Sequence, residues 1–108
     1  MKISSLNDTV RGWFIGHFDP AVYKTQDFEV GVLFHHKGQK WPKHYHKEAI
    51  EINVLISGSM KINGTLINPN DIFIIEKNEV VSPEFLEDCT IVCVKTPSVP
   101  GDKYEVES

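Results

Sequence analysis

The stretch Gly38–Gly58 reads GQKWPKHYHKEAIEINVLISG and holds two histidines and a glutamate between glycines at both ends. His44 and His46 are separated by a single residue, and Glu51 lies five positions after the second histidine. Neutral imidazole nitrogens and carboxylate oxygens are common ligands of first-row divalent metal ions. The stretch therefore indicates a metal site together with the local structure that would build it.

The spacing of the two histidines favours a strand over a helix at this position. On a helix, side chains two positions apart point about 200° away from each other, whereas on a strand they share one face. A strand that ends at His46, followed by a four-residue hairpin loop over residues 47–50, would place His46 opposite Glu51. His44 would then join these two side chains at one point.

The rest of the chain is typical of an all-β protein. Short runs of β-branched and aromatic residues recur about every ten residues, between clusters of Gly, Pro, Asn and Asp. Asn63-Gly64 predicts a tight hairpin, because both central residues of a two-residue turn need positive φ. No segment predicts a convincing helix. The predicted strands are Val10–Phe18, Phe28–His36, Lys43–Lys47, Glu51–Ser57, Ser59–Asn63, Thr65–Asn68, Asp71–Glu76, Val80–Ser82 and Thr90–Lys95.

The predicted strand Glu51–Ser57 is apolar on both faces. Asn53 shares the inward face of Glu51, whereas Ile52 and its alternate neighbours point to the opposite side. A strand of this kind is expected to be covered on both sides. The Ile52 face would pack against the N-terminal strand around Trp13 or against a second subunit, and we favour a homodimer.

Length and charge limit the classes of function. The 108 residues predict a single domain, with a barrel core over about residues 10–96 and an extended C-terminal segment over residues 97–108. The net charge of −4, without a basic face, argues against a nucleic-acid partner. No apolar run reaches the roughly 18–20 residues that span a bilayer, so no membrane partner is expected.

The two cysteines predict free thiols. Cys89 and Cys93 lie four positions apart in a predicted strand, where about 13 Å would separate them, beyond disulfide reach. The N-terminal sequence MKISSLNDTVRG lacks the apolar segment of a secretory signal. Buried, reduced thiols in a cytoplasmic protein are therefore expected.

The motif resembles the first signature of the cupin superfamily, GxxxxxHxHxxx(x)ExxxxxxG. All five defining positions match, at Gly38, His44, His46, Glu51 and Gly58. The resemblance extends over essentially the whole chain and implies an all-β fold, a small cupin-type jelly-roll β-barrel. In cupins the two histidines and the glutamate hold a metal ion in the barrel mouth. The resemblance therefore assigns His44, His46 and Glu51 as metal ligands.

The second cupin signature, GxxxxxPxGxxHxxxN, is matched only in part. Its counterpart is NDIFIIEKNEVVSPEF, which begins at Asn70 and places Val81 where most metal-binding cupins have a third histidine. Asn70 and Asn78 stand at the two glycine positions, and asparagine is the residue that best tolerates positive φ after glycine. The turns are expected to survive although the third histidine ligand is lost.

Other residues are candidates for the pocket. Glu79 precedes the missing histidine position by two residues, so on a strand it could share the inward face and replace that ligand. His35 ends a neighbouring strand and could reach the barrel mouth, or it could be a surface or packing residue. Asn53 could contact a substrate, orient the carboxylate ligand or be a polar core residue. Trp41 and Tyr45 have the opposite strand parity and are expected to pack outside the barrel or at a subunit contact rather than line the pocket.

Several functions are compatible with such a site. Two histidines and one carboxylate would bind a divalent ion with open positions, and Fe, Mn, Ni, Zn and Cu all accept these donors. An enzyme could act on a small oxygen-rich molecule, and the lack of a general base beyond Glu51 and Glu79 favours dioxygenase-like over sugar-modifying chemistry. The alternative is a non-catalytic module that binds a small-molecule ligand or assembles through the Ile52 face, with a vestigial metal site.

Overall fold

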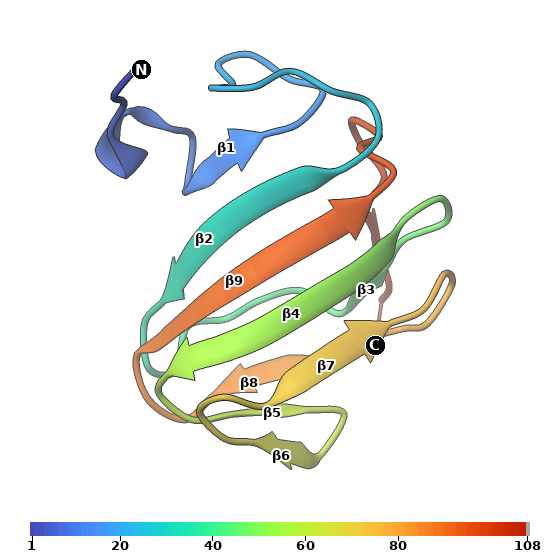
Figure 1. Ribbon diagram of the computed structural model, residues 1–108. Helices are drawn as coiled ribbons and strands as arrows, with labels where there is room; N and C mark the ends of the chain where they lie inside the picture. The colour runs from blue at the N-terminus through green and yellow to red at the C-terminus, as the bar shows by residue number, and fades with distance from the viewer. Residues whose placement is uncertain (108) are drawn as a thin grey trace.

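The computed structural model describes residues 1–107, which form a nearly all-β fold (Figure 1). This confirms the predicted fold class. Among the described residues, no helix is long and apolar enough to cross a lipid bilayer. The described elements are the short 3₁₀ helix η1 (Leu6–Asp8) and the strands β1 (Trp13–Ile15), β2 (Glu29–His35), β3 (His44–Tyr45), β4 (Ile50–Ser57), β5 (Met60–Ile62), β6 (Thr65–Ile67), β7 (Ile72–Ile75), β8 (Pro83–Phe85), β9 (Cys89–Thr96) and β10 (Tyr104–Glu105).

The strands form one large antiparallel sheet and two small ones. The large sheet has the order β1-β2-β9-β4-β7, and the small sheets have the orders β10-β3 and β6-β5-β8. In Figure 1 the small sheets lie behind and below the large one, so that they cover a single face of it. We call the covered face the inner face and the opposite one the outer face.

The inner face is apolar at one end and charged at the other. At the apolar end, Leu55 of β4 packs in a cluster with Met60 and Phe85 of the three-stranded sheet. Leu55 is completely buried, which stabilises the fold by about 1.5–3 kcal/mol. At the other end, the register aligns Glu51 of β4 with Lys95 of β9. The candidate site therefore lies over the charged end of the inner face.

Turn residues in and between the two signature stretches have positive φ. Asn63 and Gly64 have φ of 51° and 80°, which confirms the predicted tight turn between β5 and β6. Asn70 and Asn78 have φ of 74° and 65°, as expected for asparagine at two glycine positions. Gly58 has φ of +97°, and a Cβ atom there would lie 2.2 Å from the Asp88 carbonyl oxygen. This close approach explains the second glycine of the first motif.

The predicted strand Val80–Ser82 is wrong. Val81 forms only an isolated bridge with His44, and the strand β8 begins two residues later at Pro83. Proline has no N–H to donate and is tolerated at the first position of a strand. The two adjacent valines are therefore apolar residues of an irregular segment rather than a strand.

The predicted hairpin between the histidines and Glu51 is also wrong. The strand β3 pairs with β10, whereas β4 lies between β9 and β7 in the large sheet. Residues 47–49 cross from the small sheet to the large one. His46 and Glu51 therefore face each other from two different sheets.

The C-terminal segment is only partly the surface segment that we expected. The strand β10 pairs with β3, and the Tyr104 ring stacks on Tyr45 with ring centres 5.4 Å apart. Ser98 and Asp102 of the same segment are nevertheless buried. The segment therefore forms part of the packed structure around the site.

The outer face of the large sheet is apolar and open to solvent. The strand β1 pairs with β2 at the sheet edge instead of covering this face, so that expectation is wrong. No other segment within residues 1–107 covers the large side chains there, which are 38–71% exposed. These side chains are Phe34 of β2, Ile52 and Ile56 of β4, and Ile72 and Ile74 of β7.

Candidate metal centre

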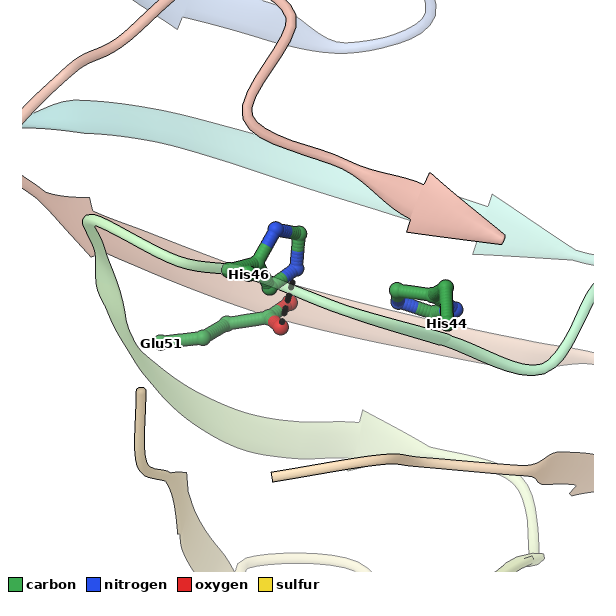
Figure 2. Close-up of side chains that lie close together, drawn as sticks. All are labelled: His44, His46 and Glu51. Carbon is green, nitrogen blue, oxygen red and sulfur yellow. Dashed lines mark ion pairs between the residues drawn. The ribbon is translucent and has the colours of Figure 1, made fainter. Parts of the chain in front are cut away.

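Three side chains with ligand atoms meet between the large sheet and the small β10-β3 sheet (Figure 2). His44 belongs to β3, His46 follows it directly, and Glu51 extends from β4. One ligand atom from each lies within 4.8 Å of the other two. Of these atoms, His46 Nε2 and Glu51 Oε2 are 3.4 Å apart. The structure thus brings together the three residues of the motif, although through a crossover between sheets.

Backbone carbonyl groups fix the orientation of both imidazole rings. His44 Nδ1 lies 2.8 Å from the carbonyl oxygen of Pro42, and His46 Nδ1 contacts the carbonyl oxygen of Asp102. A carbonyl oxygen only accepts, so each Nδ1 carries a hydrogen and, in the neutral ring, Nε2 is the atom left to bind a metal. Metal-binding histidines are usually oriented in this way.

Two ligand atoms of the site are buried without a hydrogen-bond partner. Among residues 1–107, neither His46 Nε2 nor Glu51 Oε2 has such a partner, because their mutual contact lacks hydrogen-bond geometry. Buried polar atoms of this kind are costly unless a cation or a proton compensates them. The donor set therefore fits a divalent metal ion.

The charges of the site favour the protonation states that bind a metal. Burial alone would raise the pKa of Glu51, but the His46 ring, Lys95 and the Cys93 thiol outweigh it and lower the pKa to about 2. Burial lowers the pKa of His44 despite its bond to the Pro42 carbonyl group. At neutral pH Glu51 is therefore ionised and His44 is neutral, as metal ligation requires.

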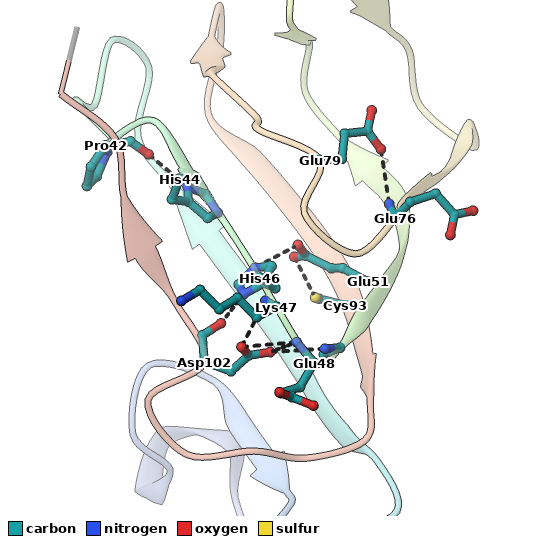
Figure 3. A network of polar contacts seen from close by, with 11 residues as sticks. Pro42, His44, His46, Lys47, Glu48, Glu51, Glu76, Glu79, Cys93 and Asp102 are labelled. Atoms are coloured by element: carbon teal, nitrogen blue, oxygen red, sulfur yellow. Dashed lines mark hydrogen bonds and ion pairs between the residues drawn. The ribbon is translucent and has the colours of Figure 1, made fainter.

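Asp102 supports the crossover that positions the site (Figure 3). Its carboxylate accepts the backbone N–H groups of Lys47, Glu48 and Ala49 at 2.9–3.2 Å. Its carbonyl oxygen accepts the His46 Nδ1–H group. Asp102 was not predicted as part of the site, because an aspartate in the stretch PGDK has no local signal beyond that of a surface turn.

Cys93 contacts the carboxylate from the neighbouring strand. Its thiol donates to Glu51 Oε1 at 3.1 Å, and burial raises the pKa of the thiol well above its usual value. Cys93 therefore stays protonated and holds one carboxylate oxygen in place. Both Cys93 and Cys89 are buried and free within the described residues, as predicted, but no sequence pattern indicates the contact of Cys93 with Glu51.

Glu79 does not take the place of the missing third histidine. Its Oε1 accepts the backbone N–H of Glu76 at 3.0 Å in an exposed turn away from the cluster (Figure 3). The prediction failed because this segment is not a strand and the alternation of faces does not apply. Val81 keeps a backbone role, since it exchanges two hydrogen bonds of 2.8 and 3.1 Å with His44.

A cavity of about 550 Å³ opens beside the three ligands. His35 and Asn53 line it, and the His35 ring stacks on Phe85 with ring centres 4.3 Å apart. Trp41 also lines the cavity, which corrects our expectation that it lies outside. It belongs to an irregular segment before β3, where strand parity has no meaning. Tyr45 instead stacks on Tyr104 and is not part of the lining.

Comparisons with known proteins identify the fold. No family model matches the chain, and no curated protein matches it. Among solved structures, an uncharacterized protein with a double-stranded β-helix domain from Klebsiella pneumoniae is 24% identical, with 99% of this chain and 93% of that chain covered and a TM-score of 0.71.

Two solved structures with described activities or ligands are also similar. A sugar phosphate isomerase of the cupin superfamily from Silicibacter pomeroyi is 20% identical, with 76% of this chain and 58% of that chain covered and a TM-score of 0.59. The pirin YhhW from Escherichia coli, in complex with nickel(II), is 18% identical, with 82% and 39% covered and a TM-score of 0.65. This chain therefore has the double-stranded β-helix fold of the cupin superfamily.

Proposed function

We propose that this chain binds one divalent transition-metal ion through His44, His46 and Glu51 and acts on a small molecule in the adjoining cavity. The observation that carries the proposal is the state of the ligand atoms. Both rings are oriented through Nδ1, and the buried Nε2 of His46 faces a buried, ionised carboxylate without a hydrogen-bond partner among residues 1–107. A pirin of similar fold has been solved in complex with nickel(II), which supports the proposal.

The residues of the chain would divide the chemistry between them. A bound ion would supply Lewis acidity and, with two histidines and one carboxylate, open positions for an oxygen-rich ligand. Glu51 supplies the negative charge, Cys93 holds its second oxygen, and Asp102 fixes the His46 ring. An open two-histidine, one-carboxylate site favours dioxygenase-like chemistry.

A specific observation favours a second candidate, a non-catalytic binding module. Within the described residues, Glu51 is the sole carboxylate side chain that lines the cavity. Since Glu51 would be occupied as a ligand and Glu79 lies elsewhere, no second carboxylate there can serve as a general base. A protein that captures a small molecule without converting it would need none.

We also propose that the outer face is covered by a second copy of the chain. Its five exposed side chains expose on the order of 500 Å² of apolar surface, within the range of patches that mark interaction sites. A standard interface buries about 800 Å² per partner, so face-to-face packing of two such sheets would supply more than half of the area that a dimer needs.

Metal analysis tests the proposed site. Protein purified without chelator is expected to contain about one metal ion per chain, and a His44→Ala/His46→Ala variant is expected to contain almost none. His36→Ala is the matched control, because His36 is an exposed histidine outside the cluster. Equal metal content in the double variant and the wild type would refute the ligand assignment.

A separate measurement distinguishes an enzyme from a binding module. The metal-loaded protein is incubated aerobically with a ligand that binds the cavity, and oxygen uptake and ligand mass are followed. Oxygen uptake with a changed ligand mass supports dioxygenase-like catalysis. A ligand that is recovered unchanged, with every metal tested, supports the binding module.

A further inference from the structure

Three cationic side chains line the cavity of an acidic protein. They are Arg11, Lys95 and Lys103, and the chain as a whole carries a net charge of −4. Within residues 1–107, no carboxylate oxygen forms an ion pair with any of them at 4.0 Å or less. Glu51, the sole carboxylate of the described lining, would be neutralised by a metal ion. The lining of this cavity therefore holds more cationic than anionic side chains, whereas Asp19, Glu29 and Asp102 line a neighbouring cavity that shares the three cations.

Aromatic rings of the cavity wall hold the two lysines. The Lys103 ammonium lies 4.2 Å from the centre of the Trp41 ring, and the Lys95 ammonium lies 5.0 Å from that of Trp13. Such contacts attract a cation to a ring face and limit its freedom. Lys95 is further fixed by its place opposite Glu51 in the sheet register. Both ammonium groups are thus already located beside the cavity.

The cations are close enough to disfavour one another. Burial, followed by repulsion from Lys95, lowers the pKa of Lys103, and Arg11 adds to the repulsion. Arg11 also has a left-handed φ of 55° in a tight turn before Gly12, where asparagine would be less strained. Strained, mutually repelling groups are typical of sites that bind a ligand of opposite charge.

Deeper in the cavity, buried polar atoms are without partners. Asn53 is 4% exposed and His35 is 8% exposed. In the described part of the chain, neither Asn53 Nδ2 nor His35 Nδ1 has a hydrogen-bond partner. The walls around them are formed by apolar side chains such as Phe73, Ile75 and Phe85. This composition suits a ligand with an apolar body and one further polar group.

We propose that the cavity binds a small organic anion, with its carboxylate or phosphate group between Arg11, Lys95 and Lys103 and its flat apolar body against the aromatic walls. The proposal deepens the proposed function, since it names the ligand class of the same cavity. None of the three cations is a metal ligand, so the anion site can be tested on metal-free protein.

The chain provides its own optical probe for this site. Its two tryptophans, Trp13 and Trp41, are the two rings that contact the lysines. Chelator-treated protein is titrated at low ionic strength with benzoate, phenyl phosphate and the neutral analogue benzamide, and tryptophan fluorescence is followed. We expect at least one anion to bind saturably and benzamide to bind at least about tenfold more weakly. Comparison of the two anions distinguishes a carboxylate from a phosphate ligand.

Two variants separate the anion site from other effects. Lys95→Met/Lys103→Met is expected to weaken anion binding to the metal-free protein at least about tenfold. Lys47→Met is the matched control, because Lys47 also lies over an aromatic ring, that of Tyr104, but outside the cavity. Thermal unfolding monitors folding of each variant. If the double variant is unfolded, Arg11→Gln and the salt dependence of binding provide the same test.

The metal proposal and the anion proposal can fail separately, because anion binding is measured on metal-free protein. Anion binding that persists in His44→Ala/His46→Ala supports the cation cluster whether or not the metal proposal holds. Benzamide affinity equal to that of both anions, or wild-type affinity in the lysine double variant, would overturn the anion proposal and leave the metal proposal unaffected. Binding of neither anion to metal-free protein would also overturn it.

Discussion

Replacing Asp102 with asparagine is expected to destabilise the fold without removing any candidate ligand. The Asp102 side chain is buried, and both carboxylate oxygens accept N–H groups of the crossover at residues 47–49. Asparagine has one acceptor oxygen, and its NH₂ group would face an N–H donor. Each buried donor left without a partner costs about 1–3 kcal/mol. The loss of one acceptor and of the negative charge should lower the free energy of unfolding by about 2–4 kcal/mol.

The same substitution should weaken metal binding. The Asp102 carbonyl oxygen orients the His46 ring, and the crossover carries the chain from His46 to Glu51. A shift of this segment would misplace one imidazole relative to the carboxylate. Loss of such an orienting partner typically reduces metal affinity by about 10–100-fold.

Urea unfolding of the metal-free variant measures the change in stability, and competition with a chromophoric chelator measures the metal affinity. Asp88→Asn is the control, because Asp88 is exposed and, within residues 1–107, its carboxylate accepts only one backbone N–H, that of Lys37 at 2.8 Å. The Asp88→Asn substitution should lower the free energy of unfolding by less than about 1 kcal/mol and leave metal affinity unchanged. An Asp102→Asn variant within about 0.5 kcal/mol of the wild type would refute the role of the carboxylate. Lower stability with undiminished metal affinity would refute its link to His46.

Three further predictions follow from individual residues. Gly58→Ala should destabilise the fold by more than about 2 kcal/mol in urea unfolding, because its Cβ would lie 2.2 Å from the Asp88 carbonyl oxygen at φ of +97°; a neutral effect would contradict this. The pKa of Glu51 falls from 4.5 to about 2 on folding, so its contribution to stability is complete above pH 4.5 and is lost as the pH falls toward 2. The free energy of unfolding of the metal-free protein should therefore fall by up to about 3 kcal/mol over this range. The Glu51→Gln variant should show a correspondingly smaller fall. Ile74→Lys should convert a dimer to a monomer in sedimentation, whereas Leu66→Lys, at an exposed site on β6, should not; a monomeric wild type would refute the interface.

The fold was predictable where local sequence decides the backbone. Positive φ at Asn63, Asn70 and Asn78 follows from residue type, and these turns separate the strands that alternation predicts. The partner of β3 was not predictable in this way. A hairpin to β4 requires only adjacent residues, whereas the observed pairing of Tyr45 with Tyr104 joins segments far apart in the chain. Such a choice depends on packing between sheets.

Of the residues of the candidate site, only the three ligands could be predicted from the sequence. His44, His46 and Glu51 lie within eight residues, so their spacing alone predicts that they meet. Asp102 and Cys93 reach the same point from strands and turns distant in sequence, and their identification requires the register of β9 and the path of the C-terminal segment.

Val81 shows how the backbone role and the ligand role of one position can separate. Its N–H and carbonyl groups still hold His44 in place, while its side chain adds an apolar surface where many cupins have an imidazole. A site with two histidines and one carboxylate depends more strongly on the orientation of its ligands than a site with a third histidine would. Asp102 and Cys93 provide this orientation. A bound divalent ion would add to the positive charge of the cavity and attract an anion more strongly. Because linkage is reciprocal, the anion would strengthen metal binding by the same factor and so offset the missing third histidine.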